Sequence, residues 1–141
     1  MYRTVSQKLK LMPVQFDTVK RIAGCCRYVH NHFLARLETE TVSYDTCRRE
    51  LKSQISHNHW LQEPHESVLM YALKSMYRRY KYGGANDKPR YLSKYKTIAF
   101  RVFDVAVEGN SVIIPTIGKI KCRGLSKRIG IHPILSATII V

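Results

Sequence analysis

The spacing of the apolar residues constrains the fold of this chain more than any other feature, because it changes once along the sequence. Between residues 16 and 80, apolar residues recur every three or four positions, which is the period of one face of an α-helix. After residue 97 they recur at every second position, as on one face of a β-strand. We therefore expect a helical block followed by strands, and hence an α+β chain.

The helical block divides into three helices. Asp17 or Thr18 is the expected N-cap of the first, Ser43 that of the second, and the third begins after Pro64 and stops at the glycines 83–84. The apolar stripes are Phe16, Val19, Ile22, Ala23, Cys26, Val29, Phe33 and Leu37 in the first helix, Tyr44, Cys47, Leu51 and Ile55 in the second, and Val68, Leu69, Ala72, Leu73, Met76 and Tyr80 in the third.

Strand patterns flank the helical block on both sides. Residues 2–11 alternate well enough for a strand that ends before Pro13. Residues 97–115 predict two strands joined by a turn at 108–110, and residues 117–124 and 132–141 predict further strands. We expect the first strand to pair with the later ones, so that the helices form an insertion. The last pattern runs to Val141 without a turn or polar tail, which predicts that a partner covers the strand or that the protein continues.

The charge of the chain points to a polyanion as partner. Twenty-four Lys and Arg residues against ten Asp and Glu give a net charge of +14, and a compact domain relieves such self-repulsion by binding negative charge. Nucleic acid is the first candidate and an anionic membrane surface the second. No run of about eighteen apolar residues and no apolar signal segment occur, so we expect a soluble, cytoplasmic protein.

Catalytic and metal-binding motifs are absent from the sequence. The four cysteines form no C-x-x-C pair, and no P-loop, G-x-S-x-G or H-E-x-x-H occurs. The string His30-Asn31-His32 spells the name of a nuclease motif, but that motif needs widely spaced residues, and we expect Asn31 to pack or to contact phosphate. The acids form no clear pair for two-metal hydrolysis. We expect no enzyme activity, no metal site and no cofactor.

The stretch from residue 77 to residue 96, YRRYKYGGANDKPRYLSKYK, interleaves basic residues with tyrosines and holds a single acid. Lys and Arg contact phosphates, and tyrosines stack on unpaired bases. The glycine pair lets the backbone approach a phosphate or turns the chain. We expect nucleic-acid contacts from Lys88, Arg90, Tyr91, Lys94, Tyr95, Lys96 and Arg101, and from a second basic patch of Lys119, Lys121, Arg123, Lys127 and Arg128. A solvated face is the alternative for the second patch, and a core position for Tyr91.

Five stretches, in order, resemble the N-terminal half of TnpB, the transposon-encoded RNA-guided nuclease also called OrfB transposase and related to type V CRISPR effectors. They are KLKLMPVQFD, AGCCRYVHNHFLARL, HWLQEPHESVLMYALKSMYRRYKY, KPRYLSKYKTIAFR and IIPTIGKIKCRG. The second stretch matches through Gly24, Arg27, Tyr28, Asn31 and Leu34. This chain departs from the family in Cys26, where Ala is usual, and in Tyr91, where Phe is common.

The resemblance implies an architecture and a function. Residues 1–12 and 97–141 would form a small oligonucleotide-binding-like β-barrel, the wedge domain, and residues 13–96 an inserted helical recognition domain. Together they would grip a guide RNA and the guide–target duplex and read a short DNA motif beside the target. The RuvC-like nuclease half, with its catalytic acids, is not matched, so the expected partners also include a separate RuvC-containing chain or another copy of this one, inside a prokaryotic cell or its nucleoid.

The resemblance also adds site residues. Arg27 and Asn31 on the first helix, and Lys74 and Arg78 off the apolar stripe of the third, join the expected contacts to RNA or heteroduplex. The expected readers of the DNA motif are Tyr44, Arg48, Glu66 and Met70, where Arg48 suits guanine and Glu66 cytosine. Two other functions stay open: a stand-alone DNA-binding regulator that uses the helical block, and a small structural RNA-binding protein of ribosomal type.

Overall fold

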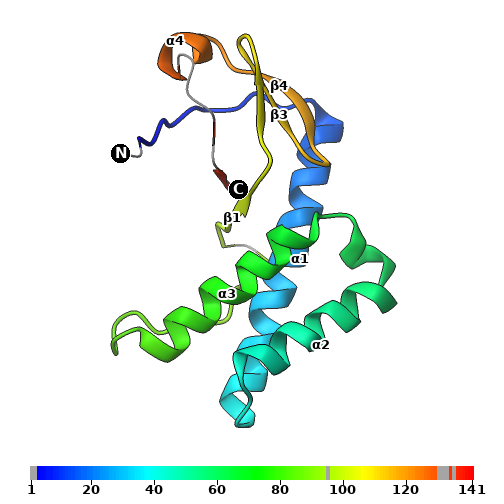
Figure 1. Ribbon diagram of the computed structural model, residues 1–141, viewed down its shortest axis with the longest axis vertical. Helices are drawn as coiled ribbons and strands as arrows, with labels where there is room; N and C mark the ends of the chain where they lie inside the picture. Colours follow the sequence, from blue (N-terminus) through cyan, green and yellow to red (C-terminus); the bar gives the residue numbers. More distant parts are fainter. Residues whose placement is uncertain (1–2, 95, 130–133, 135) are drawn as a thin grey trace.

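The chain folds into a helical half and a strand half, which lie one above the other (Figure 1). The computed structural model describes residues 3–94, 96–129, 134 and 136–141. The helical half contains α1 (Pro13–Thr39), α2 (Tyr44–His57), a short 3-10 helix η1 (His59–Gln62) and α3 (Glu66–Tyr82). The strand half contains β1 (Ala99–Val102), β2 (Ala106–Glu108), β3 (Ser111–Ile114), β4 (Gly118–Lys121), the short helix α4 (Leu125–Ile129) and β5 (Ala137–Ile140). The expected α+β class is confirmed.

The long helix α1 belongs to both halves. Its first turn is tied to the strand half by Gln15, whose Nε2 donates to the carbonyl oxygen of Lys119 at 2.9 Å. Its later turns pack against α3, which also holds α2. The expected apolar stripe is buried from Val19 to Leu37, but Phe16 is 44% exposed and carries the ammonium group of Lys20 at 4.8 Å from its ring centre.

The three helix starts follow local capping chemistry. α1 begins at Pro13, where the Gln15 side chain accepts the Met12 N–H at 3.0 Å, so the expected capping by Asp17 or Thr18 is wrong. The Thr18 hydroxyl instead donates to the carbonyl oxygen of Val14 inside the helix. Ser43 caps α2 as expected, accepting the Thr46 N–H at 3.1 Å.

The end of α3 needs the glycine that stands there. Gly83 is the C-cap residue, as expected, and its N–H donates to the carbonyl oxygen of Arg79. A Cβ atom at Gly83 would overlap the Arg79 carbonyl and lie 2.9 Å from that of Asp87, whereas a Cβ at Gly84 would meet nothing within 4 Å. The first glycine therefore allows the chain to turn back tightly against its own helix.

The strands form two small antiparallel sheets. β1 pairs with β5, with Ala99 opposite Ile140, and β2, β3 and β4 form a second sheet in that order. The turn between β2 and β3 lies at Gly109, as expected, with φ at 60°. The single strand expected from residue 97 to 108 is wrong, because Asp104, with φ at 58°, breaks it. β1 and β2 consequently belong to different sheets.

The expected N-terminal strand is also wrong in the described segment 3–12. Its burial alternates, with Val5, Gln7, Leu9 and Leu11 half-buried, but no strand ladder forms. Polar contacts to α4 hold the segment instead. The Arg128 guanidinium donates to the carbonyl oxygen of Ser6 and to the Gln7 side chain, both at 2.9 Å, and Arg3 donates to the Arg128 carbonyl. α4 itself is an element that the alternation did not predict.

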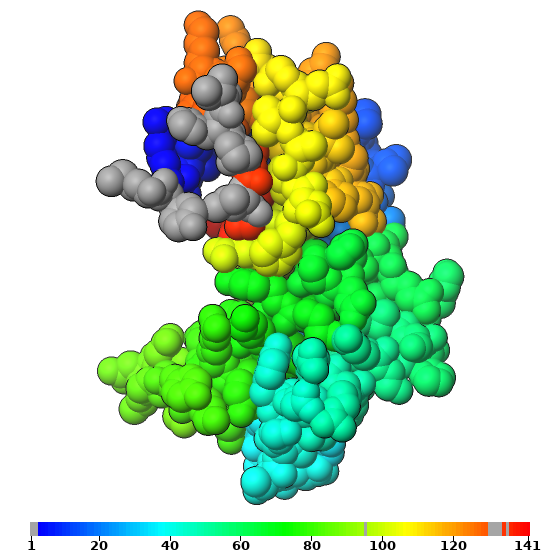
Figure 2. Space-filling model, viewed as in Figure 1, coloured from blue at the N-terminus to red at the C-terminus, as the bar shows by residue number. Residues whose placement is uncertain are grey.

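One hydrophobic core joins the two halves, running from Val19 and Leu73 to Phe100 and Ile120. In the space-filling view, the yellow strand residues lie directly against the green surface of α3 (Figure 2). Within the described residues, neither sheet closes into a barrel. No helix in that part of the chain is long and apolar enough to cross a membrane.

The four cysteines are buried free thiols, as their spacing suggested. Burial raises the pKa of Cys25 to about 11 and that of Cys26 to about 12. Thiols that stay protonated are poor nucleophiles, so these residues act as small core side chains.

Candidate nucleic-acid interface

The segment between α3 and β1, residues 83–97, runs back along α1, and we call it the strap. Two neighbouring side chains on α1 hold it. His30 Nε2 donates to the carbonyl oxygen of Arg90 at 2.8 Å, and the Asn31 amide both donates to the carbonyl and accepts the N–H of Leu92, each at 2.8 Å. Asn31 thereby makes the two hydrogen bonds to Leu92 that a residue of a neighbouring strand would make. The structure shows Asn31 in this structural contact, and its expected contact to nucleic acid stays a prediction.

The third residue of the string, His32, faces the opposite way. Its Nε2 lies 3.0 Å from the Gln54 amide and 3.3 Å from Glu50, both on α2. Burial lowers the pKa of His30, against the effect of the Arg90 carbonyl, which raises it. His30 is therefore a neutral hydrogen-bond donor at neutral pH, and the string as a whole fastens α1 to two different elements.

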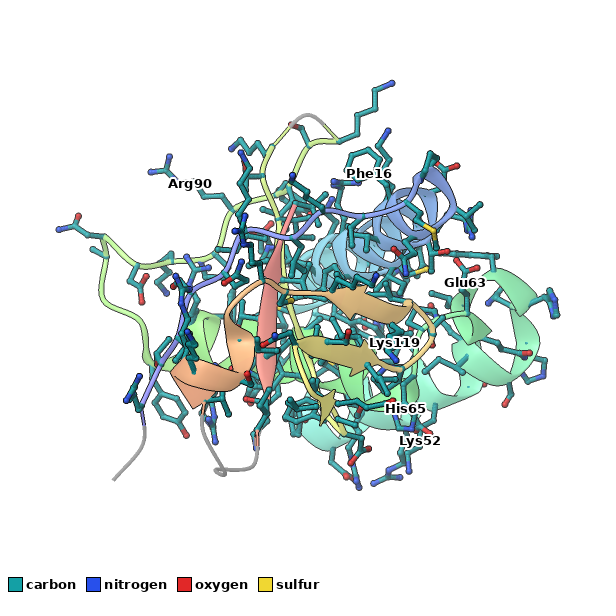
Figure 3. The ribbon with its side chains drawn as sticks, turned by 90° about the horizontal axis from the view of Figure 1, so that it is seen from above. Phe16, Lys52, Glu63, His65, Arg90 and Lys119 are labelled. Carbon is teal, nitrogen blue, oxygen red and sulfur yellow. The ribbon has the colours of Figure 1, made fainter. Side chains whose placement is uncertain are left out.

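The strap presents its basic side chains to solvent. Lys88 lies 5.4 Å from the ring centre of Tyr80, and Arg90 points away from the body of the molecule (Figure 3). Tyr91 is 49% exposed, so it is not a core residue, and its hydroxyl donates to Glu38 at 2.8 Å, which raises the tyrosine pKa. Tyr95, another expected contact, lies outside the described residues.

A pocket of about 310 Å³ lies between α1, the end of the strap and the β1–β5 sheet, and we call it the basic pocket. Four cationic residues line it, and no acidic residue does. The lining comprises Lys20, Ala23 and Arg27 from α1, Lys94, Lys96 and Thr97 from the strap, and Ile98 and Val141, whose backbones are hydrogen-bonded to each other. Within the described part of the chain, the Arg27 Nε atom is buried and has no hydrogen-bond partner.

A second, shallower depression of about 300 Å³ lies where α2 and α3 meet the strand half, and we call it the aromatic hollow. Its lining residues are Tyr44, Ser67, Met70, Tyr71, Lys74 and Phe103. The rings of Tyr71 and Phe103 are 5.8 Å apart, and the Arg101 guanidinium lies 4.8 Å over Tyr71. Apolar rings with two cations beside them can receive a base and its phosphate.

Two of the four expected readers of the DNA motif meet in the aromatic hollow. These are Tyr44 and Met70, which lie 26 positions apart in the sequence. Arg48 and Glu66 are exposed and do not line the hollow. Arg48 donates to Asp45 at 3.0 Å, so a base would have to compete with that carboxylate.

The expected second basic patch is on β4 and the segment through α4. The alternation is confirmed: Lys119, Lys121 and Arg123 are exposed, and the residues between them are buried. Lys119 pairs with Glu108 at 3.3 Å, and Arg128 holds the N-terminal segment, which leaves Lys121, Arg123 and Lys127 as the open part of the patch.

The acidic residues neutralise a particular subset of the cations. Glu63 pairs with Arg21, Glu40 and Glu50 with Arg36, Asp45 with Arg48 and Arg49, Asp87 with Arg79, and Glu108 with Lys119. In the described part of the chain, no acid pairs with Arg27, Lys74, Arg78, Lys88, Arg90, Lys96, Arg101, Lys121, Arg123, Lys127 or Arg128. Most of the expected cationic contacts therefore have no acidic partner among the described residues, whereas Lys119 has one.

The lining residues that sequence reasoning missed include Lys20, Tyr71 and Phe103. Lys20 precedes Arg27 by seven positions and so shares its face of α1, and that spacing was the signal that could have found it. Tyr71 and Phe103 carry no such signal, because they meet only through the packing of α3 on β1. No cluster of three or more His, Cys, Asp or Glu side chains suited to a metal ion occurs among the residues described.

No protein-family model matches this chain, and no curated protein matches it either.

Proposed function

We propose that this chain is the nucleic-acid-binding part of a TnpB-like RNA-guided DNA endonuclease. It grips the guide RNA and the guide–target duplex and contacts a short DNA motif beside the target. In this scheme α1 to α3 form the recognition domain, and the strand half belongs to a barrel of the oligonucleotide-binding type. The resemblance of five ordered sequence stretches supplies the family, and the surface chemistry supports the binding.

The observation that carries the proposal is the division of the cations into two sets. Acids neutralise cations such as Arg36 and Arg49 on the helices, whereas Lys88 and Arg90 on the strap have no acidic partner among the described residues. A chain that only needed a solvated surface would gain by placing acids beside those cations. Uncompensated charge along one exposed segment instead suits a phosphate backbone.

The aromatic hollow supports the DNA contact. Tyr44 and Met70 face one depression, Tyr44 also packs against Tyr77 at 5.2 Å between ring centres, and Lys74 lies at the same site. This combination suits the edge or face of a base whose phosphate meets the lysine.

Salt-dependent binding tests the proposal. The probe is a structured hairpin RNA with a single-stranded extension, titrated at several salt concentrations. Lys88→Ala with Arg90→Ala should lower the slope of log affinity against log salt by about 1.4 to 1.8, since each lost phosphate contact removes roughly 0.7 to 0.9. Arg49→Ala with Lys52→Ala removes the same charge from α2 and should leave the slope close to that of the wild type.

The outcome separates the proposal from its competitors. An unchanged slope in the strap variant would mean that the strap cations face only solvent. Binding of duplex DNA without binding of RNA would indicate a stand-alone regulator. Co-purified ribosomal RNA, preferred over the hairpin, would indicate a ribosomal type of RNA binder.

We further propose that the chain does not cut nucleic acid by itself. Several of its acids are engaged separately, with arginines or with Tyr91, and the described acids form no cluster suited to a metal ion. Incubation with labelled single- and double-stranded DNA and Mg²⁺ should give no cleavage. Cleavage that survives repurification, and disappears when one carboxylate of this chain is replaced, would overturn this part of the proposal.

A further inference from the structure

We propose that the basic pocket seats one phosphate group of the bound nucleic acid, with the Arg27 Nε–H as its buried donor. The inference rests on the proposed function and adds to it a specific phosphate seat, distinct from the diffuse contacts of the strap. It also assigns a role to Lys20, which no sequence motif singled out.

The buried donor is the first observation. Arg27 Nε is shielded from water and, among the described residues, has no acceptor. A buried donor without an acceptor destabilises a folded protein, and such groups are rare unless a ligand or ion completes them. A guanidinium offers its donors in a planar fork that matches two oxygens of a phosphate.

The composition of the pocket is the second observation. Lys20 and Arg27 come from α1, Lys94 and Lys96 come from the strap, and no carboxylate side chain lines the space between them. Cations brought together from two segments make the space between them favourable for an anion. Because the cations come from two segments more than sixty positions apart, their convergence belongs to the fold and not to a local basic run.

The size and the remaining lining suit a phosphate that is still attached to a sugar. A volume of about 310 Å³ corresponds to roughly ten water molecules at about 30 Å³ each, which is more than a bare phosphate needs. Ala23, Ile98 and Val141 supply an apolar side to the pocket. A ribose can lie against that side while its phosphate meets the cations.

The hydrogen bonds that hold the strap on α1 explain how the pocket keeps its shape. Lys20, Ala23 and Arg27 lie three and four positions apart, and so share one face of α1. The next turn carries His30 and Asn31, which hold Arg90 and Leu92 of the strap. The fixed strap then delivers Lys94 and Lys96 to the same face. The pocket is therefore preorganised by hydrogen bonds that do not involve its own cations.

Two sources can supply the phosphate: the monoester at the 5′ end of an RNA, or a diester within the chain. Two hairpin RNAs of identical sequence, one with a 5′-phosphate and one with a 5′-hydroxyl, distinguish them. The protein variants are Arg27→Met, which keeps the apolar stem, and Lys20→Ala. Lys52→Ala, an exposed lysine on α2, is the matched control for Lys20→Ala.

If the phosphate is an internal diester, Arg27→Met should weaken the binding of both RNAs equally. The loss should be about tenfold or more, as expected for a lost charged hydrogen bond. The substitution should also lower the salt slope by about 0.7 to 0.9. For a terminal monoester, the wild type should prefer the phosphorylated RNA, and Arg27→Met should abolish that preference. Either result supports the seat, and Lys52→Ala should match the wild type in both cases.

A measurement on the wild-type protein guards against a folding defect in the variants. The Arg27 Nε–H resonance, assigned by its loss in Arg27→Met, should shift on addition of inorganic phosphate or of the RNA, but not of chloride at equal ionic strength. If this resonance is unmoved by both ligands, the inference is overturned.

The inference and the proposed function fail in different ways. If Arg27→Met and Lys20→Ala bind both RNAs like the wild type, while the strap variant Lys88→Ala with Arg90→Ala binds more weakly, the pocket holds no phosphate and the proposed function stands. If the wild type binds neither RNA, both proposals fall together.

Discussion

Two adjacent side chains on α1 decide where the strap lies, and their roles show the limit of reading short strings. The residues of His30-Asn31-His32 share no common target: the first two hold the strap and the third holds α2. The sequence suggested that Asn31 packs or contacts a phosphate, but it does not show that Leu92 is its partner. The partner is 61 positions away and is brought there by the fold.

The titration of His30 should make the stability of the protein depend on pH. Burial lowers the pKa of His30 in the folded state below its ordinary 6.5, so the unfolded chain binds the proton first. The contribution to the free energy of unfolding is complete above about pH 6.5 and is lost as the pH falls toward the lowered folded pKa. The slope in that window should be at most about 1.4 kcal/mol per pH unit.

The control for this titration is His30→Gln, whose side-chain amide can still donate to the Arg90 carbonyl but takes up no proton. Urea unfolding between pH 5 and 8, measured on both proteins, isolates the effect from that of the other five histidines. Equal pH dependence in the two proteins would show that His30 is not buried as a neutral donor.

At the scale of elements, we expect replacement of the two glycines at the end of α3 to affect stability differently. Gly83→Ala should lower the free energy of unfolding by more than 1 kcal/mol, because its Cβ would overlap backbone atoms of Arg79 and approach Asp87. Gly84→Ala meets no atom within 4 Å and should be close to neutral. Thermal unfolding of the two variants tests this. A Gly84→Ala protein that is less stable than the Gly83→Ala protein would contradict it.

The sequence predicted well those elements in which the periodic burial of side chains coincides with regular backbone hydrogen bonding. The stripes of α1, α2 and α3 and the turn at Gly109 belong to this group. The N-terminal segment has the right alternation of burial, but the side chain of Arg128 takes the place of a neighbouring strand. The break at Asp104 has no signal in the apolar pattern, since it depends on a single positive φ between two apolar runs.

At the scale of the whole molecule, the candidate sites are less predictable than the elements that build them. The expected nucleic-acid contacts of the cations stay a prediction, and the pocket that the structure shows joins residues 20 and 27 with residues 94 and 96. That grouping follows from the antiparallel return of the strap along α1. Neither the composition of the chain nor the spacing of its apolar residues predicts that grouping.

The exposed strand β5 should make the protein self-associate when RNA is absent. β5 pairs with β1, and within the described residues no strand lies on its other side, while Ile140 is 72% exposed. Open strand edges with β-branched residues add further strands, and a charge on the edge opposes this. Ile140→Lys should therefore reduce self-association at low salt in sedimentation experiments.

Val14→Lys is the matched control, because Val14 is 74% exposed but lies on a helix, so that the same change of charge removes no strand edge. Added RNA should reduce the association of the wild type only in part, since the RNA covers the basic surfaces and leaves the edge open. A wild-type protein that is monomeric at micromolar concentration would show that this edge does not recruit another strand.

The pairing of β1 with β5 also sets the order in which a nascent chain can mature. The hydrogen bonds from His30 and Asn31 to the strap involve only residues up to 92, so they can form while the ribosome is still adding later residues. The sheet must wait for residues 137–140, and Ile98 finds its backbone partner only in Val141. During synthesis the strap cations are thus exposed before Ile98 and Val141 complete the lining of the basic pocket. Under the proposed function, an RNA that meets a partly synthesised chain would contact the strap cations before the proposed phosphate seat is complete.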